Sequence, residues 1–197
     1  MTNHSTKSGN SNRFRIIGGE WRSRKLGFPG GIEGLRPTPD RIRETLFNWL
    51  QMKIAGAHCL DLFAGSGALS FEALSRGAAS VTALDLSSKV TSSLRENCSI
   101  LSCKNLEIIG TDAMQWLRKQ SGKEQYDVVF LDPPYKLDLL QDCLDLLAAG
   151  NFVKTGGMIY LESDRALESL AFPAGCCLVK SKKAGQVFYG VCEIEMK

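Results

Sequence analysis

Short apolar segments alternate with amphipathic ones from residue 58 onwards, and this alternation limits the possible folds more than any other feature of the chain. It predicts strands that alternate with helices, which is the pattern of a parallel sheet covered on both faces. The predicted strands are His58–Phe63, Ser80–Asp85, Leu106–Gly110, Tyr126–Asp132 and Gly157–Glu162, followed by an antiparallel pair, Cys177–Lys182 and Gln186–Glu195, around a turn at Ala184 and Gly185. The predicted helices are Ala68–Arg76, Ser88–Ser102, Ala113–Lys119 and Leu137–Ala149, with a short helix near Ala166–Leu170.

This pattern predicts an α/β fold, a doubly wound seven-stranded sheet with an antiparallel hairpin at its carboxyl-terminal edge. Ligands of such sheets bind in the crevice outside the carboxyl ends of the parallel strands. The residues that directly follow the first four predicted strands are therefore the candidates for a functional site.

The composition fits one compact domain with a small appendage. Apolar residues make up 44% and charged residues 23% of the 197 residues, which is ordinary for a soluble globular protein. No apolar run approaches the roughly 18 to 20 residues that cross a bilayer, and residues 1–12 form a polar leader that we expect to be disordered. The seven cysteines contain no C-x-x-C pair and only two histidines are present, so we expect a reduced cytoplasmic protein with no metal site.

Positive charge is concentrated near the amino terminus. Residues 1–50 contain nine Lys/Arg and four Asp/Glu, whereas the rest of the chain contains 15 and 17. Such a basic end on a near-neutral body indicates contact with a polyanion. Residues 13–50 form a predicted basic extension: a hairpin from Arg13 to Lys25 with Gly18 and Gly19 as its turn, then a helix from about Pro39 capped by Thr38. The predicted doubly wound domain is residues 51–197.

Three acidic or glycine-rich segments follow the first three predicted strands. The turn from Asp61 to Leu69 places Gly65 and Gly67 where a ligand can approach backbone amides, but Ser70 departs from the dinucleotide-binding fingerprint. Asp85 follows Gly65 by twenty residues, the spacing at which a carboxylate reaches ribose hydroxyls, while Ser87 or Ser88 can cap the next helix. Asp112 can accept from an adenine amino group or cap its own helix. Together these positions favour an adenosyl cofactor.

The fourth predicted strand ends in Asp132, Pro133, Pro134 and Tyr135. Two adjacent prolines fix the backbone and remove two N–H donors, so that a carboxylate and carbonyls remain as rigid acceptors beside an aromatic ring. This arrangement suits an amino group on a flat ring. Acceptors that hold both N–H bonds favour a pyramidal nitrogen whose lone pair can attack an electrophilic methyl group. Tyr135 would stack on the base.

With these motifs in place, the chain resembles the RsmD family of small-subunit rRNA guanine-N2 methyltransferases over nearly its whole length. The segments that carry the resemblance are Arg15–Leu26, Leu35–Leu50, Cys59–Leu69, Glu72–Arg76, Asp132–Tyr135 and Ala184–Phe188. The Asp-Pro-Pro-Tyr segment alone is shared with adenine-N6 and cytosine-N4 methyltransferases, and the amino-terminal segments are much more specific.

The resemblance implies a Rossmann-like methyltransferase that uses S-adenosylmethionine and modifies one guanine of 16S rRNA within the small ribosomal subunit. It implies that the cofactor is bound by Asp61, Phe63, Ala64, Gly65, Ser66, Gly67, Asp85, Asp112 and Ala113, and the target base by Asp132, Pro133, Pro134 and Tyr135. The basic side chains Arg13, Arg15, Arg22, Arg24, Lys25, Arg36, Arg41 and Arg43 would then contact rRNA, mostly at phosphates. We expect a monomer.

Two other functions remain open from the residues alone. The acceptor cage would hold an adenine amine as well as a guanine amine, which leaves an adenine-N6 methyltransferase on RNA or DNA. A non-catalytic RNA-binding assembly factor could also retain the fold, although it would have no use for an intact Asp-Pro-Pro-Tyr segment. The choice of guanine rests on the resemblance.

Overall fold

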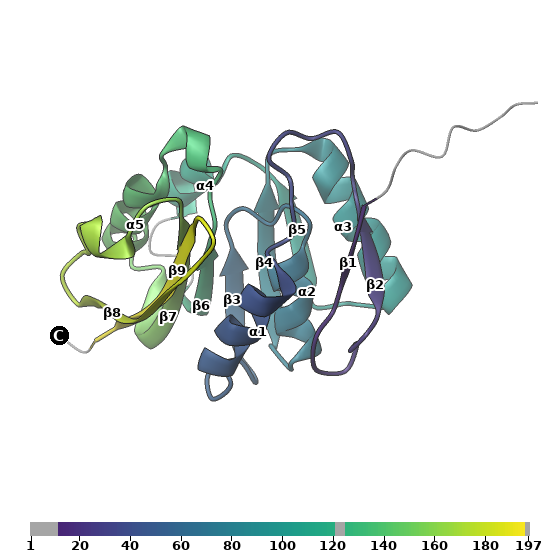
Figure 1. The fold of residues 1–197 in the computed structure, drawn as a ribbon, viewed down its shortest axis with the longest axis horizontal. Coiled ribbons are helices and arrows are strands. Elements are labelled where there is room, and N and C mark those ends of the chain that lie inside the picture. The colour runs from purple at the N-terminus through teal and green to yellow at the C-terminus, as the bar shows by residue number, and fades with distance from the viewer. Residues whose placement is uncertain (1–11, 121–124, 196–197) are drawn as a thin grey trace, which may run out of the picture.

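The computed structural model describes residues 12–120 and 125–195, and within them it has the predicted seven-stranded sheet (Figure 1). The strands lie in the order β5-β4-β3-β6-β7-β9-β8, with β5, β4, β3, β6 and β7 parallel and the β8–β9 hairpin antiparallel at one edge. Their bounds are β3 His58–Asp61, β4 Ser80–Asp85, β5 Leu106–Gly110, β6 Tyr126–Leu131, β7 Val153–Ser163, β8 Cys176–Ala184 and β9 Val187–Ile194. The predicted fold class is confirmed.

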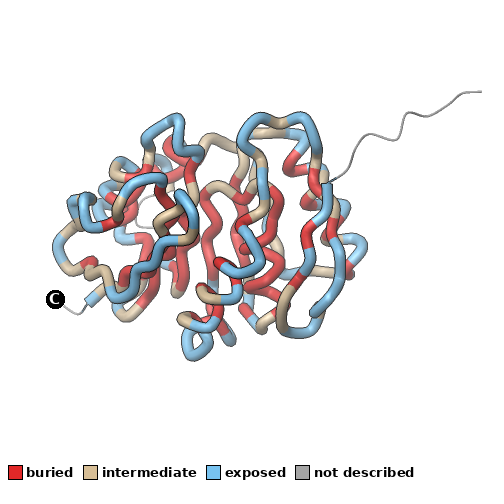
Figure 2. Tube along the Cα trace, viewed as in Figure 1, coloured by how far each residue is buried: buried red, intermediate tan, exposed pale blue. Residues whose placement is uncertain are grey.

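Successive residues of the central strands face two separate hydrophobic cores. Cys59 and Val128 belong to the core that contains α1 (Asp40–Trp49), α2 (Ala68–Ser75) and α3 (Ser88–Leu101). Leu60 and Val129, one residue further along, belong to the core under α4 (Ala113–Gln120) and α5 (Leu140–Ala149). Because side chains alternate along a strand, helices on both faces leave the central strands β3, β4 and β6 almost fully buried (Figure 2).

Two elements of residues 51–197 begin three or four residues away from their predicted starts. Strand β7 begins at Val153, four residues before the predicted start, through the glycine pair at Gly156 and Gly157. The predicted helix from Leu137 begins instead at Leu140, because a short 3-10 helix, η1, occupies Tyr135–Leu137 and Asp138 turns the chain with a φ of 48°. The short helix near Ala166–Leu170 is the 3-10 helix η2, Leu167–Ser169.

The amino-terminal extension forms a separate two-stranded hairpin of β1 (Asn12–Arg15) and β2 (Lys25–Phe28), as predicted. Of the predicted disordered leader, residues 1–11 lie outside the described residues and Asn12 is already part of β1. Strand β2 packs on α3, where the side chain of Asn97 donates to the carbonyl oxygen of Gly27 at 2.8 Å. The β1–β2 hairpin therefore lies on the β4–β5 half of the sheet (Figure 1).

The glycine pair of the hairpin does more than make a turn, since the connecting loop rests on the end of α2. Gly19 has a φ of 74°, and a Cβ atom there would lie 1.7 Å from the carbonyl oxygen of Ser75. That oxygen accepts the N–H of Glu20 at 2.7 Å, and the Ser75 hydroxyl donates to the carbonyl of Gly18 at 2.6 Å. A side chain at position 19 would separate the extension from the domain.

The predicted capping role of Thr38 is wrong. Helix α1 has Pro39 as its N-cap residue and no side-chain cap. Thr38 is buried, its carbonyl oxygen accepts from Arg43, and its side chain hydrogen-bonds to Glu162. Within the described residues, no helix combines the length and the apolar character that a bilayer crossing requires.

Candidate active site

The strand order reverses between β3 and β6, so a crevice opens at the carboxyl ends of these two neighbouring strands. Asp61 ends β3 and is paired in register with Phe130 of β6. Asp132 follows Leu131, the last residue of β6. The topology thus brings the glycine-rich turn and the Asp-Pro-Pro-Tyr segment to the same place, although they are some seventy residues apart in the sequence.

The turn after β3 is built around Gly67, which has a φ of 79° and precedes α2. A Cβ atom at Gly67 would lie 2.5 Å from Leu94, so close packing of α2 against α3 also requires glycine there. Asp61 beneath the turn is 3% exposed and accepts the hydroxyl of Ser70 at 2.6 Å. Burial raises the pKa of Asp61 to about 7. Ser70, the residue that departs from the dinucleotide fingerprint, is therefore the partner of this carboxyl.

Asp85, at the end of β4, lies against the same turn. One carboxylate oxygen accepts the N–H of Gly65 at 3.0 Å and the other accepts the N–H of Ser87 at 2.8 Å. Ser87 caps α3, as predicted, by accepting the N–H of Val90. Each carboxylate oxygen keeps a second lone pair for a further donor. Burial raises the pKa of Asp85.

The remaining residues of the predicted cofactor site lie on two segments. Phe63 and Gly65 are half-buried in the turn, while Ala64 and Ser66 are buried. Asp112 accepts the N–H of Gln115 at 2.8 Å at the start of α4. Of the two roles that the sequence left open for Asp112, the structure shows the helix cap. Ala113 is the first residue of that helix and is buried.

Three carboxyl groups gather at the carboxyl ends of β3, β6 and β7. Leu131 and Leu161 are register partners, so Asp132 and Glu162 follow them side by side. Burial raises the pKa of Asp132 well above its usual range, and the charges of Glu162 and Asp61 add to the rise. Among residues 12–120 and 125–195, no ion pair reaches any of these three carboxyls.

Glu162 is the functional residue that sequence reasoning missed. It is 4% exposed and accepts the hydroxyl of Tyr160 at 2.6 Å. Burial raises its pKa, and side-chain hydrogen bonds from Tyr160, Thr38 and Tyr135 oppose the rise. One buried carboxylate therefore joins β7, the extension and the Asp-Pro-Pro-Tyr segment. The sequence did hold one signal for Glu162: it ends a predicted strand, and that strand lies next to the one that precedes Asp132.

The four residues of the Asp-Pro-Pro-Tyr segment differ in how far they are exposed. Pro133 is buried, Asp132 is half-buried, and Pro134 and Tyr135 are exposed. The ring of Tyr135 is thus open to solvent at the mouth of the crevice, while burial raises the pKa of its hydroxyl. The next residue, Lys136, forms an ion pair with Glu33, which ties the loop of the extension to the Asp-Pro-Pro-Tyr segment.

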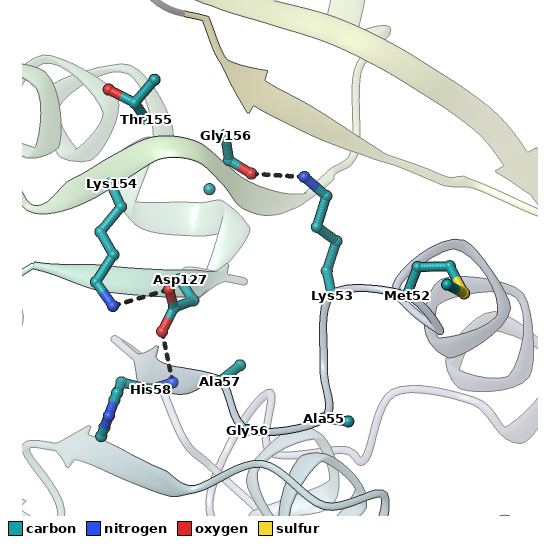
Figure 3. A pocket seen from close by; sticks show the side chains of 11 residues that line it. Met52, Lys53, Ala55, Gly56, Ala57, His58, Asp127, Lys154, Thr155 and Gly156 are labelled. Carbon is teal, nitrogen blue, oxygen red and sulfur yellow. Dashed lines mark hydrogen bonds and ion pairs between the residues drawn. The ribbon is translucent and has the colours of Figure 1, made fainter.

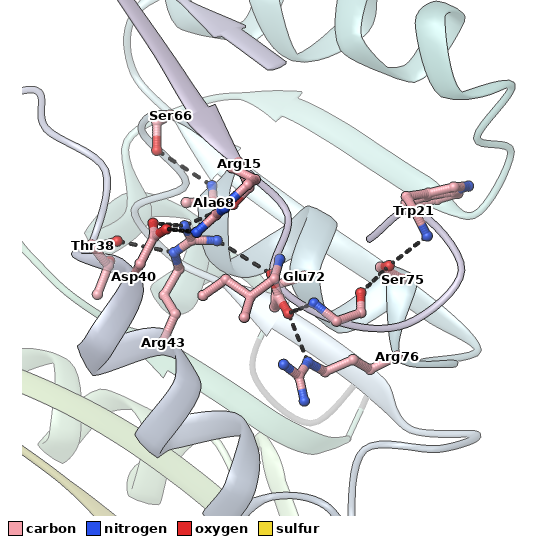
Figure 4. A network of polar contacts seen from close by, with 12 residues as sticks. Arg15, Trp21, Thr38, Asp40, Arg43, Ser66, Ala68, Glu72, Ser75 and Arg76 are labelled. Carbon is pink, nitrogen blue, oxygen red and sulfur yellow. Dashed lines mark hydrogen bonds and ion pairs between the residues drawn. The ribbon is translucent and has the colours of Figure 1, made fainter. Parts of the chain in front are cut away.

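Arg43, one of the predicted RNA contacts, is not available to RNA. Its side chain is fully buried and its guanidinium donates to Glu72 at 3.2 Å, to Asp40 at 2.6 Å and to two backbone carbonyls (Figure 4). Burial lowers the pKa of Arg43 and the two carboxylates oppose that change. The prediction is wrong because a basic residue at the edge of an amphipathic helix can turn inward when a buried acid faces it.

Glu72 receives this arginine on α2 and is itself 0% exposed. Its two oxygens accept from Arg43, from Arg76 at 2.7 Å, and from the backbone N–H groups of Ile17 and Gly18, both at 2.8 Å. Four donors fill the four lone-pair positions of a carboxylate. This network anchors the extension to the domain (Figure 4).

The seven other predicted RNA contacts are exposed. They are Arg13, Arg15, Arg22, Arg24, Lys25, Arg36 and Arg41. Arg15 is paired with Asp40 at 3.1 Å and Arg24 donates to the carbonyl of Ile100 at 3.1 Å. All seven belong to the extension, whose buried residues share one hydrophobic core with α3.

A second hollow lies at the opposite end of the sheet, near the amino ends of the central strands (Figure 3). It has a volume of about 440 Å³ and its lining includes His58 and Asp127, which stand at or near the amino ends of β3 and β6. Its charged groups are already engaged: Lys154 pairs with Asp127 at 2.8 Å, and Lys53 pairs with Glu193 at 3.2 Å. None of the described residues that surround the carboxyl-end crevice lines this hollow.

The fold and the crevice together define an S-adenosylmethionine-dependent methyltransferase. Comparison with known proteins agrees: the family model described as "Conserved hypothetical protein 95" matches residues 14–193. The chain belongs to this family, the RsmD family of methyltransferases.

Curated relatives and a solved structure cover almost the whole chain. Ribosomal RNA small subunit methyltransferase D of Escherichia coli K12 is 42% identical over 185 residues, 94% of this chain and 92% of the relative. The protein of the same name from Haemophilus influenzae is 44% identical over 177 residues, 89% of this chain and 91% of the relative. The structure of the putative methyltransferase yhhF from Escherichia coli superposes with a TM-score of 0.84 at 42% identity, covering 94% of this chain and all of that one.

Proposed function

We propose that this protein transfers the methyl group of S-adenosylmethionine to the exocyclic N2 amine of a guanine in small-subunit (16S) ribosomal RNA. The observation that carries the proposal is the Asp132–Tyr135 segment at the strand-order reversal, beside the glycine turn and two further buried carboxyls. The names of the relatives support small-subunit rRNA as the substrate. Acting on ribosomal subunits, the protein would work in the cytoplasm, and we propose a monomer.

The residues after β3 and β4 fit the cofactor. Asp85 has two lone-pair positions left for ribose hydroxyls after accepting from Gly65 and Ser87. Leu86, directly after it, is 75% exposed and offers an apolar surface for an adenine ring. The turn from Asp61 to Gly67 would hold the methionine part, with Ala113 on the adenine side. When bound, S-adenosylmethionine supplies an electrophilic methyl group carried on a positively charged sulfur.

Asp132 and the proline carbonyls would hold the amino group of the base. A carboxylate and a carbonyl that accept both N–H bonds favour a pyramidal nitrogen, and they fix its lone pair in one direction. Tyr135 would stack on the base, which contributes on the order of 1–3 kcal/mol and offsets part of the cost of unstacking it. The ring is exposed at the crevice mouth, where a base would arrive.

The carboxyl cluster would also accept the proton that the amine loses. Burial and the charges of Glu162 and Asp61 raise the pKa of Asp132, which makes its carboxylate a better proton acceptor than an exposed one. A strong base is not needed, because the nitrogen becomes acidic once it carries the methyl group.

The experiment that tests this function uses small ribosomal subunits from cells that lack the corresponding methyltransferase. The subunits are incubated with the purified protein and isotopically labelled S-adenosylmethionine, and the RNA is then digested to nucleosides for mass spectrometry. We expect label in N2-methylguanosine. Label in N6-methyladenosine would keep the chemistry of Asp132 and overturn the choice of guanine. Absence of label on subunits and on naked rRNA would favour a non-catalytic assembly factor.

A further inference from the structure

Three lysines gather at the tip of the β8–β9 hairpin, at the edge of the sheet farthest from the β1–β2 hairpin. Lys180, Lys182 and Lys183 are exposed and lie within the last five residues of β8. The first four residues of that strand, Cys176–Val179, contain no charge. Lysines on an edge strand also discourage unwanted strand pairing, but for that purpose they would be spread along the strand. Their concentration beside the turn points to a contact at that end.

The turn that joins β8 and β9 lies at the carboxyl ends of the parallel strands, the same end of the sheet as the crevice. Lys182 is paired in register with Tyr189, and Tyr189 in turn with Glu162. Glu162 lies beside Asp132 through the Leu131–Leu161 pairing. Neighbouring strands lie about 4.8 Å apart, so the backbone of Lys182 is about 10 Å from that of Glu162 and about 15 Å from that of Asp132.

The positive charge of these lysines is not neutralised. Among the described residues, Lys180, Lys182 and Lys183 form no ion pair, whereas Lys53 and Lys154 at the opposite edge both do. Two of the three lie over aromatic rings: the ammonium of Lys183 is 4.5 Å from the ring centre of Phe188, and that of Lys182 is 5.8 Å from Trp49. These rings restrict the two side chains without removing their charge.

We propose that the tip of the β8–β9 hairpin is a second RNA-binding surface, which holds backbone phosphates on the side of the crevice opposite the β1–β2 hairpin. In Figure 1 the hairpin and the β1–β2 extension lie on opposite sides of α1. The strand order places them at opposite halves of the sheet, with Asp132 between them. RNA that delivers a base to Tyr135 would then be held by cations on both sides. The inference rests on the proposed function, because it takes rRNA as the substrate.

The test replaces Lys180, Lys182 and Lys183 together by glutamine. The matched control replaces Lys104, Arg118 and Lys119 by glutamine, which removes the same charge from three exposed side chains at or near the amino end of β5 and the carboxyl end of α4, away from the crevice. Binding to deproteinised 16S rRNA and to small ribosomal subunits is measured over a range of salt concentrations. Binding of S-adenosylmethionine is measured by calorimetry to establish that the fold is intact.

We expect the hairpin variant to bind RNA roughly tenfold or more weakly at 0.1 M salt, and its plot of log affinity against log salt to be shallower by about two to three. The control variant should bind like the unaltered protein, and both variants should bind the cofactor normally. Equal RNA affinity and equal salt dependence in the two variants would overturn the inference. Methylation of guanine by the unaltered protein, followed in the same preparation, separates failure of the inference from failure of the proposed function.

A photoreactive residue at position 182 identifies what the hairpin touches. Cross-links to nucleotides after irradiation on subunits would support the inference. Cross-links to ribosomal protein alone would overturn it, since the hairpin would then be a protein-docking surface. An unaltered protein that binds neither rRNA nor subunits would overturn both the inference and the proposed function.

Discussion

Two buried glutamates, one on α2 and one near the carboxyl end of β7, have contrasting surroundings. Glu72 is 0% exposed and receives two guanidinium groups and two backbone N–H groups. Glu162 is 4% exposed, receives only hydroxyl groups among the described residues, and lies beside a second carboxyl. Burial of a carboxylate is costly unless cations and donors compensate for the lost water. The first centre has that compensation and the second does not.

The contrast separates a structural role from a chemical one. The Glu72 network binds the extension to the domain, and the segments that carry the family resemblance in the extension, Arg15–Leu26 and Leu35–Leu50, meet Glu72–Arg76 there. Glu162 also joins the extension to the Asp-Pro-Pro-Tyr segment, but through hydroxyl groups alone, and its charge raises the pKa of Asp132 at the place where the proposed reaction needs a proton acceptor. Groups with strongly shifted pKa values concentrate at functional sites for this reason.

The largest effect that we expect is on stability, and it comes from breaking the buried ion pair between Arg43 and Glu72. Arg43→Ala leaves Glu72 and Asp40 without their buried partner, and removing one member of a buried ion pair typically costs about 3–5 kcal/mol. Urea denaturation followed by circular dichroism measures the free energy of unfolding. Arg41→Ala, an exposed neighbour on the same helix, is the control and should change it by less than about 0.5 kcal/mol. Equal stability of the two variants would show that Arg43 is not an anchor.

The next largest effect is on catalysis, and it comes from removing Asp132, the carboxyl beside Glu162. Asp132→Ala removes the central acceptor of the amino group, and we expect kcat for guanine methylation to fall by about 10²–10³-fold. RNA binding should remain close to that of the unaltered protein. The free energy of unfolding should not fall, because within the described chain no ion pair depends on Asp132 and its carboxylate lacks a compensating cation. Asp142→Asn, an exposed acid on α5, is the control. A variant that keeps its methylation rate would contradict the role of Asp132.

The sequence predicted the fold and the location of the crevice, because strand–helix alternation and strand-end residues are local signals. It predicted the Asp-Pro-Pro-Tyr segment and the glycine turn for the same reason. It failed on the two glutamate centres. Arg43 is a surface residue by composition and becomes buried only because Glu72, twenty-nine residues away, faces it. Glu162 becomes part of the site only through the register of β6 and β7. Both depend on pairings that no local pattern contains.

The smallest effect that we expect comes from removing the charge of Glu162 while the shape of its side chain is kept. Glu162→Gln keeps an acceptor for the hydroxyl of Tyr160 but removes the charge that, after burial, contributes most to the raised pKa of Asp132. Asp132 must be ionised to accept a proton, so activity falls as the pH drops through its raised pKa. Removal of the neighbouring charge lowers that pKa and moves the acidic limb of kcat/KM to lower pH.

The midpoint in the variant should still lie above that of an ordinary carboxyl, because burial, the largest cause of the shift, remains. The measurement is initial methylation rate at subsaturating subunits across the pH range, with Glu44→Gln, an exposed acid on α1, as the matched control. A limb that stays in place in Glu162→Gln would mean that the two carboxyls do not influence each other in the working enzyme. A shift to higher pH would mean that Glu162 normally favours ionisation of Asp132, the reverse of what two adjacent carboxylates should do.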